Sequence, residues 1–305
     1  MKYINRRKFV LSTTTLLASL PWGNILAADK KYKPMRFGIL TDIHYAELTP
    51  RANRYYHEAL SKTVECVEFM NQQKVEFLLE NGDLKDQGKT VEETLRFLDT
   101  IESELQKFNG PLYHVLGNHD ADNISKTQFL SRIKNTGFSK PSAHYSFDRG
   151  SWHFIALDAN YTSKGVSYDS GNFDWTDCHV PADQLEWLKK DLNKNNKPTI
   201  VFIHQQLDDI SYPIEHRVHC PNNSAEVRTI LEASGNVPLV FQGHYHNGGF
   251  NTINGINYYT LSSIVEGTGS QANSFAVVEI DETLNIQIKG YQKAVSKYLP
   301  KKQVY

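Results

Sequence analysis

Residues 112–120 read LYHVLGNHD, an apolar stretch followed by Gly117 and then by Asn118, His119 and Asp120 in direct succession. Neighbouring side chains on a strand point to opposite faces, so three adjacent polar side chains cannot all face a core. A turn at Gly117 would direct them toward a shared polar target. Apolar runs that end in polar residues occur at four more places in the chain, and this repetition decides the fold.

The repeated pattern is a strand, a loop and a helix. Short apolar runs suited to strands lie at residues 35–40, 75–80, 111–116, 199–204 and 237–246. Helical patterns lie at about residues 51–73, 90–107 and 181–193. Strands separated by helices predict an α/β sheet covered on its faces, in which ligands gather at the carboxyl ends of the strands.

Polar clusters follow all five apolar runs. Their members are Asp42, His44, Asp83, Asn118, His119, His204, His244 and His246. This set is larger than one octahedral ion needs and suits two ions. Mixed oxygen and nitrogen donors favour manganese, iron or zinc over magnesium or calcium alone. A bridging carboxylate can hold two such ions about 3.5–4 Å apart, the spacing used in phosphoryl displacement.

Five motifs occur in a fixed order along the chain. They are D-x-H at residues 42–44, G-D-x-x-D at 82–86, G-N-H-D at 117–120, a strand-end His204, and G-H-x-H at 243–246. The set resembles the calcineurin-like metallophosphoesterase family over nearly the whole chain from Met35 onward. The resemblance implies a four-layer α/β/β/α sandwich with a dinuclear metal site at the strand ends.

The resemblance also implies a role for each residue of the motifs. One metal would be held by Asp42, His44 and His246. The other would be held by Asn118, His204 and His244, with Asp83 as the bridge. A hydroxide between the metals would attack phosphorus in line. His119 would protonate the leaving oxygen, and Asp120 would orient the His119 ring. Asp86 is interpreted as a helix-start carboxylate outside the ligand set.

Four further segments resemble the manganese-dependent ADP-ribose/CDP-alcohol diphosphatase branch of that family. They are NRYYHEAL at residues 53–60, DQLEWL at 183–188, GHYHNGG at 243–249 and SSIVEG at 262–267. The branch typically has Gln where this chain has His44 and Glu where it has Asp120. The resemblance implies two divalent ions, with manganese favoured, and a small nucleotide-derived phosphorylated substrate. The alternative is a broad-specificity phosphomonoesterase or phosphodiesterase.

Four residues are expected to contact the substrate: Arg54, Tyr55, Asn247 and Glu266. An arginine fork suits a second phosphate, and aromatic rings suit a nucleobase or ribose. The polar, aromatic segment 160–177 is too long for a simple connection and is interpreted as a lid or substrate loop.

Two other function classes are compatible with parts of the sequence. A binding protein that kept the fold without its chemistry would be expected to lack some ligands, and none of the motif ligands is missing. A zinc amidase uses His and Asp ligands but does not need the G-N-H-D order. The chain has 33 basic and 34 acidic residues, so it offers no polycationic surface for nucleic acid.

Residues 1–28 have the layout of an export signal, with a basic start, an apolar run and small residues near Ala27 and Ala28. Arg6 and Arg7 resemble the twin-arginine signal, and a general secretory signal is the alternative. The apolar run is too short to span a bilayer, so no stable membrane anchor is expected. We therefore expect a periplasmic or secreted protein whose precursor uses the twin-arginine machinery.

The mature chain is expected to comprise a catalytic domain at residues 35–292 and a C-terminal tail at 293–305. Of the three cysteines, Cys178 and Cys220 are expected to form a disulfide, as suits an exported protein, and Cys66 to be a buried thiol. A zinc clip formed by CHVP (178–181) and HRVHC (216–220) matches no common structural spacing.

Overall fold

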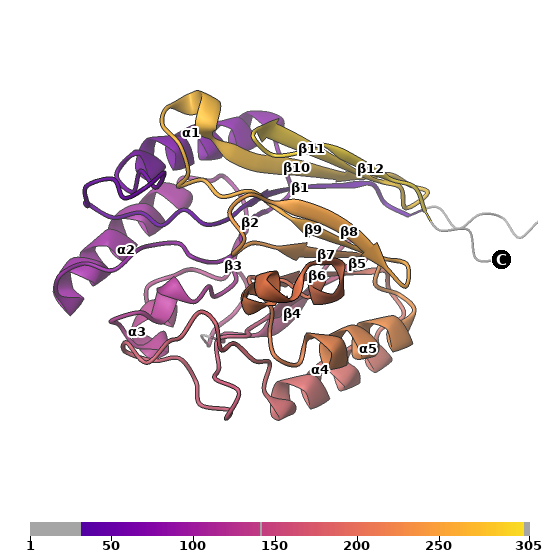
Figure 1. Cartoon of the computed structure of the whole chain (residues 1–305). Coiled ribbons are helices and arrows are strands. Elements are labelled where there is room, and N and C mark those ends of the chain that lie inside the picture. Colours follow the sequence, from indigo (N-terminus) through magenta and orange to yellow (C-terminus); the bar gives the residue numbers. More distant parts are fainter. Residues whose placement is uncertain (1–31, 141, 302–305) are drawn as a thin grey trace, which may run out of the picture. The chain divides into compact units, whose positions relative to one another are not determined.

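The computed structural model describes residues 32–140 and 142–301 (Figure 1). The predicted export signal lies outside the described residues. Within the described part, no helix is long and apolar enough to cross a bilayer.

The first sheet has six strands in the order β12-β11-β10-β1-β2-β3. Their bounds are β1 Met35–Leu40, β2 Leu78–Glu80, β3 Leu112–His114, β10 Ser274–Ile280, β11 Ile286–Gln292 and β12 Lys297–Leu299. β1, β2 and β3 are parallel, so their carboxyl ends meet at one edge. The remaining three strands extend the sheet in antiparallel fashion.

The second sheet also has six strands, in the order β4-β5-β6-β7-β9-β8. Their bounds are β4 Tyr145–Arg149, β5 Trp152–Leu157, β6 Thr199–Ile203, β7 Leu239–Gln242, β8 Gly249–Ile253 and β9 Ile256–Thr260. The central strands β5, β6, β7 and β9 are parallel. The segments that follow β6 and β7 carry His204, His244 and His246.

Helices cover the outer face of each sheet, which gives the expected four layers (Figure 1). The helices are α1 Glu58–Gln73, α2 Val91–Leu105, α3 Lys126–Leu130, α4 Ala182–Lys194 and α5 Ser224–Ser234. Short 3₁₀ turns include η1 His119–Ala121, η2 Asp209–Ser211, η3 Ile214–His219 and η4 Ser270–Ala272. α1 and α2 pack on the first sheet, and α4 and α5 pack on the second.

The core between the two sheets is rich in aromatic side chains. Phe37 stacks on Phe77 with ring centroids 4.7 Å apart and meets Phe154, Phe202 and Phe241 edge to face. All five rings are fully buried. Such packing joins the sheets rigidly, so the loops at their common carboxyl edge hold fixed positions.

The start of the first helix and the C-terminal end of the folded unit differ from the sequence-based prediction. The first helix begins at Glu58 and not near residue 51, because residues 51–57 form turns and isolated bridges. The folded unit also continues beyond residue 292, where a tail was predicted. β12 pairs with β11, and Leu299 is buried in the core between the sheets. β12 is so short that its sequence shows no recognisable alternation of apolar and polar residues.

Candidate metal centre

Four of the predicted ligands have left-handed backbone conformations. The φ angles are 52° at Asp42, 46° at His44, 59° at Asp83 and 65° at His244. A residue with a Cβ adopts this region at a cost, and such residues cluster at functional sites. Here the turns direct side chains from separate strand ends toward one point.

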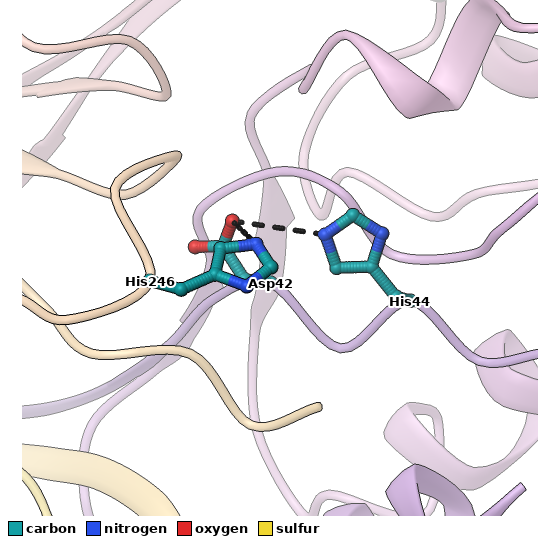
Figure 2. Close-up of side chains that lie close together, drawn as sticks. All are labelled: Asp42, His44 and His246. Carbon is teal, nitrogen blue, oxygen red and sulfur yellow. Dashed lines mark ion pairs between the residues drawn. The ribbon is translucent and has the colours of Figure 1, made fainter. Parts of the chain in front are cut away.

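Asp42, His44 and His246 form the first group of possible ligands (Figure 2). The Asp42 carboxylate oxygen Oδ1 lies 3.9 Å from His44 Nε2 and 3.4 Å from His246 Nε2. Figure 2 shows a ring nitrogen of His44 and a ring nitrogen of His246 directed at the same Asp42 carboxylate. The three side chains can therefore bind one ion.

Asp83, His204 and His244 form the second group. Asp83 Oδ2 lies 3.1 Å from His204 Nε2 and also 3.4 Å from His44 Nε2, which belongs to the first group. This carboxylate therefore lies between the two groups, where a bridging ligand is required. The Asn118 side chain is buried, and no hydrogen-bond partner satisfies its oxygen or its nitrogen.

Several buried polar atoms in these groups have no hydrogen-bond partner. They are His244 Nε2 and both polar side-chain atoms of Asn118, while His44 Nε2 and His204 Nε2 face the Asp83 carboxylate. A buried polar atom without a partner costs free energy, and imidazole nitrogens and amide oxygens are good ligands for divalent ions. The donor set thus fits two divalent metal ions.

The other ring nitrogen of three histidines is held from behind. His44 Nδ1 lies 3.2 Å from Asp86 Oδ2, and His204 Nδ1 lies 2.9 Å from a backbone oxygen. His246 Nδ1 lies 2.8 Å from Glu266 Oε1. These contacts fix each ring so that Nε2 points to the centre. Glu266, which was predicted to contact substrate, lies behind the His246 ring.

The carboxylates and histidines of the two groups stabilise one another's charged forms. Burial lowers the pKa of His44, but Asp83, Asp42 and Asp86 outweigh it and raise that pKa to about 10. Burial also lowers the pKa of His204, but the Asp83 and Asp42 carboxylates outweigh it and raise that pKa to about 9. Against the effect of burial, nearby histidines hold the pKa values of Asp42 and Asp83 below their usual range. The carboxylates are therefore ionised and ready for a cation.

The G-N-H-D turn has a different role from the one predicted for Asp120. The Asp120 carboxylate accepts hydrogen bonds from the backbone nitrogens of Asp83, Leu84 and Gly117, at 2.8–3.0 Å. It therefore joins the turn after β3 to the turn after β2, and no hydrogen bond links it to the His119 ring. A Cβ at Gly117 would lie 2.2 Å from Asp83 Oδ1, which explains the glycine.

Asp86 occupies the position that was predicted for Asp120. Its Oδ2 lies 3.2 Å from His44 Nδ1 and 3.9 Å from His119 Nδ1. The interpretation of Asp86 as only a helix-start carboxylate was therefore wrong. The second Asp of G-D-x-x-D was the available signal, because the turn after β2 places this residue beside the centre.

His119 lies at the edge of the centre. Its ring meets the His44 ring edge to face at 4.7 Å and contacts Phe173 at 5.4 Å. Burial lowers the pKa of His119 to about 4, although Asp83 and Asp86 oppose this shift. Burial therefore favours the neutral ring in the metal-free protein.

A cavity of about 440 Å³ opens over the centre. Its floor includes His44, Asp83, Asn118, His119, His244 and His246. Its walls are Arg51, Ala52, Arg54, Tyr56, Phe173, Trp175 and His219. Of the four predicted substrate contacts, Arg54 therefore lines the cavity.

Tyr55 and Asn247 do not line this cavity. Tyr56 lines it in place of Tyr55, because residues 51–57 are an irregular turn and the helical phase predicted for them does not apply. Asn247 donates to the Tyr245 hydroxyl at 3.2 Å and lines a separate cavity near β8.

The aromatic wall comes from two segments without long regular structure. Phe173 and Trp175 belong to segment 160–177, which was predicted to form a lid or substrate loop. His219 ends η3 and lies 5.3 Å from the Trp175 ring and 5.2 Å from the His244 ring. No periodicity in the sequence indicates such residues, so His219 and Arg51 were not predicted.

The predicted disulfide is absent from the described part of the chain. Cys178 and Cys220, like Cys66, are free and buried. Burial raises the pKa of Cys178 to about 12, so this sulfur is an unreactive thiol that fills space beside Tyr168. The adjoining segments are held together instead by backbone hydrogen bonds, including Asn222 N to Cys178 O at 2.8 Å.

Comparisons with known proteins agree with this centre. A manganese-dependent ADP-ribose/CDP-alcohol diphosphatase from Arabidopsis thaliana is 24% identical over 271 residues, covering 75% of this chain and 86% of the relative. A 3',5'-cyclic-nucleotide phosphodiesterase from Nostoc is 26% identical over 250 residues, covering 80% and 84%. The crystal structure of a dimetal phosphatase from Danio rerio superposes with a TM-score of 0.76 at 21% identity, covering 88% of this chain and 99% of the other.

The family comparison covers the motifs from which the site was predicted. The model of the calcineurin-like phosphoesterases matches residues 35–248, a range that includes every predicted metal ligand. Relatives and fold agree with the sequence-based resemblance, and with a hydrolase that acts on phosphoric ester or anhydride bonds through divalent ions. The chain belongs to the calcineurin-like phosphoesterase family.

Proposed function

We propose that this protein hydrolyses the diphosphate linkage of small nucleotide derivatives, such as ADP-ribose or CDP-alcohols. The observation that carries the proposal is the cavity, whose lining combines residues of a centre for two metals with two arginines and several aromatic side chains. The relatives whose names include ADP-ribose and CDP-alcohols support this substrate class.

The centre supplies the general chemistry of the family. Two divalent ions, with manganese favoured, polarise the phosphoryl group and supply a nucleophile at neutral pH when bound. We assign Asp42, His44 and His246 to one ion. We assign Asn118, His204 and His244 to the other, with Asp83 shared. In the reaction, water is added across P–O–P, so that ADP-ribose gives AMP and ribose 5-phosphate.

His119 is assigned to protonation of the leaving oxygen. Its ring lines the cavity and faces the carboxylate of Asp86. Burial favours the neutral ring, but a bound phosphate adds negative charge nearby and favours the protonated ring. Substrate binding therefore promotes the protonation state that a general acid needs.

The cavity walls favour a nucleotide over a simple phosphomonoester. Arg51 and Arg54 can bind a second phosphate, for which a monoesterase has no need. Trp175 is 43% exposed, so its ring offers free surface on which a base can stack. A phosphodiesterase remains the second candidate, since the Nostoc relative is a cyclic-nucleotide phosphodiesterase by name.

A product screen tests the substrate. Purified, manganese-loaded protein is incubated with ADP-ribose, a CDP-alcohol, a 3',5'-cyclic nucleotide and p-nitrophenyl phosphate, and the phosphorus products are separated. Nucleoside monophosphates should form from the first two substrates with the highest kcat/KM. If inorganic phosphate forms more efficiently from the monoester, the broad phosphomonoesterase function replaces this proposal.

We also propose that residues 1–28 direct export by the twin-arginine route to the periplasm or the exterior. Arg6 and Arg7, followed by Lys8, an apolar run and small residues near Ala27, support this route. Replacing both arginines by lysine should leave the precursor in the cytoplasm, which cell fractionation detects. A general secretory signal tolerates lysine, so export of the double variant would support that route instead.

A further inference from the structure

A buried lysine lies behind the segment 263–267, which carries Glu266. Lys62 of α1 is 2% exposed. Its ammonium group donates to the backbone oxygens of Ile264 at 2.8 Å, Glu266 at 3.4 Å and Gly267 at 2.6 Å. Burying an ammonium group is costly unless its donors are satisfied, and here three carbonyls accept them.

A second lysine, from the turn after β11, contacts the same segment. Lys293 follows β11, and its ammonium group donates to the backbone oxygens of Ser263 at 3.0 Å and Glu266 at 2.6 Å. The Val265 oxygen accepts from the backbone nitrogen of Tyr55. Every carbonyl from 263 to 267 is therefore bound, and two lysines bind four of the five.

Backbone nitrogens of this segment contact both loops of the first metal group. Val265 N donates to the backbone oxygen of Asp42 at 3.1 Å, and Ser263 N donates to that of His246 at 3.1 Å. The Glu266 carboxylate then lies 2.8 Å from His246 Nδ1. The segment thus connects the lysines directly to two of the predicted ligands.

The two ammonium groups share one acceptor, the Glu266 backbone oxygen, although like charges repel. Burial, followed by the charge of Lys62, lowers the pKa of Lys293 to about 8. Burial also lowers the pKa of Lys62. The negative charge of Glu266 acts to raise the pKa of both lysines. Placing two positive charges close together costs free energy. This cost indicates that the two lysines do more than satisfy the backbone oxygens of the segment.

We propose that Lys62 and Lys293 are positioning residues for His246, acting through segment 263–267 and the Glu266 carboxylate. The lysines fix the backbone of the segment, and this in turn fixes Glu266 against Nδ1 of the imidazole. The ring then presents Nε2 to the first metal. The inference rests on the metal assignment proposed above. It also gives a function to Lys293, which lies in the part of the chain predicted to be a tail.

The test measures manganese binding to the purified metal-free chain by titration calorimetry. Lys293→Met should weaken one of the two binding steps by about 10- to 100-fold, as removal of an outer partner typically does, and leave the other unchanged. Lys293→Arg should restore most of the affinity. Lys289→Met is the matched control, because Lys289 lies on β11 and pairs with Glu279 at 2.7 Å. Lys293→Gln retains a donor and replaces the Met variant if that variant unfolds.

A double variant separates positioning from a general structural role. If Lys293 acts through Glu266, Lys293→Met should cause no further loss of affinity in a Glu266→Gln background. Additive losses, or wild-type affinity in Lys293→Met, would overturn the proposal. Wild-type binding of two manganese ions by His246→Ala would instead overturn the metal assignment, so the two failures can be distinguished.

Discussion

The floor and the walls of the cavity differ in how firmly the fold holds them. On the floor, His44, Asp83 and Asn118 are at most 1% exposed and lie in the turns that follow buried strands. On the walls, Trp175 is 43% exposed and belongs to a segment without helix or long strand. A rigid floor fixes which bond is broken, while irregular walls can change the substrate without changing that chemistry.

The largest effect of a single change outside the metal ligands is expected at His119. His119→Ala should retain both metals and lose about 10²–10⁴-fold in kcat for poor leaving groups, because a general acid supplies a factor of this size. The loss should shrink for p-nitrophenyl esters, whose leaving group needs little protonation. Equal losses for both substrate types would assign His119 another role.

The second prediction concerns the pH dependence of manganese binding. In the metal-free chain His44 and His204 have pKa values of about 10 and 9, so metal binding must displace protons below these values. Manganese affinity should therefore rise about tenfold per pH unit for each displaced proton, or at least about 100-fold between pH 6 and 8. The same protonated histidines stabilise the metal-free fold below pH 6.5, and this contribution is lost as the pH rises through 9 and 10. Affinity that does not change with pH would contradict the protonation states given above.

The Asp86→Asn variant tests whether the metal centre depends on residues that do not themselves bind metal. Asp86→Asn removes the charge that faces His44 and His119, and it should reduce manganese affinity and kcat by about 10- to 100-fold. Asp174→Asn is a suitable control, because Asp174 is an exposed carboxylate on the segment that carries Trp175. An Asp86→Asn enzyme as active as this control would show that Asp86 has no positioning role.

The smallest effect is expected on the walls. Trp175→Ala should raise KM for ADP-ribose about tenfold, near the low end of the range for base stacking because the ring is partly exposed. The kcat/KM for p-nitrophenyl phosphate, which has no base, should not change. A parallel loss for both substrates would show that Trp175 supports the floor and does not recognise a base.

The difference between the floor and the walls also explains how much of the site could be predicted from the sequence. The floor was predictable because its residues follow apolar runs at fixed spacings, and both sheets bring these ends to one edge. Asp120 was correctly associated with this region but given the wrong contact, because sequence does not show which way a turn directs a carboxylate. His219 was missed because it comes from a short 3₁₀ turn with no periodicity.

The central claim is that two metal ions share Asp83, and metal analysis of Asp83→Asn tests it most directly. The substitution keeps an oxygen but removes the charge that lies 3.4 Å from His44 Nε2 and 3.1 Å from His204 Nε2. The wild-type chain should bind two manganese ions. The variant should bind at most one tightly and lose more activity than His119→Ala. Two full equivalents of manganese with undiminished turnover in Asp83→Asn would contradict the shared-carboxylate centre.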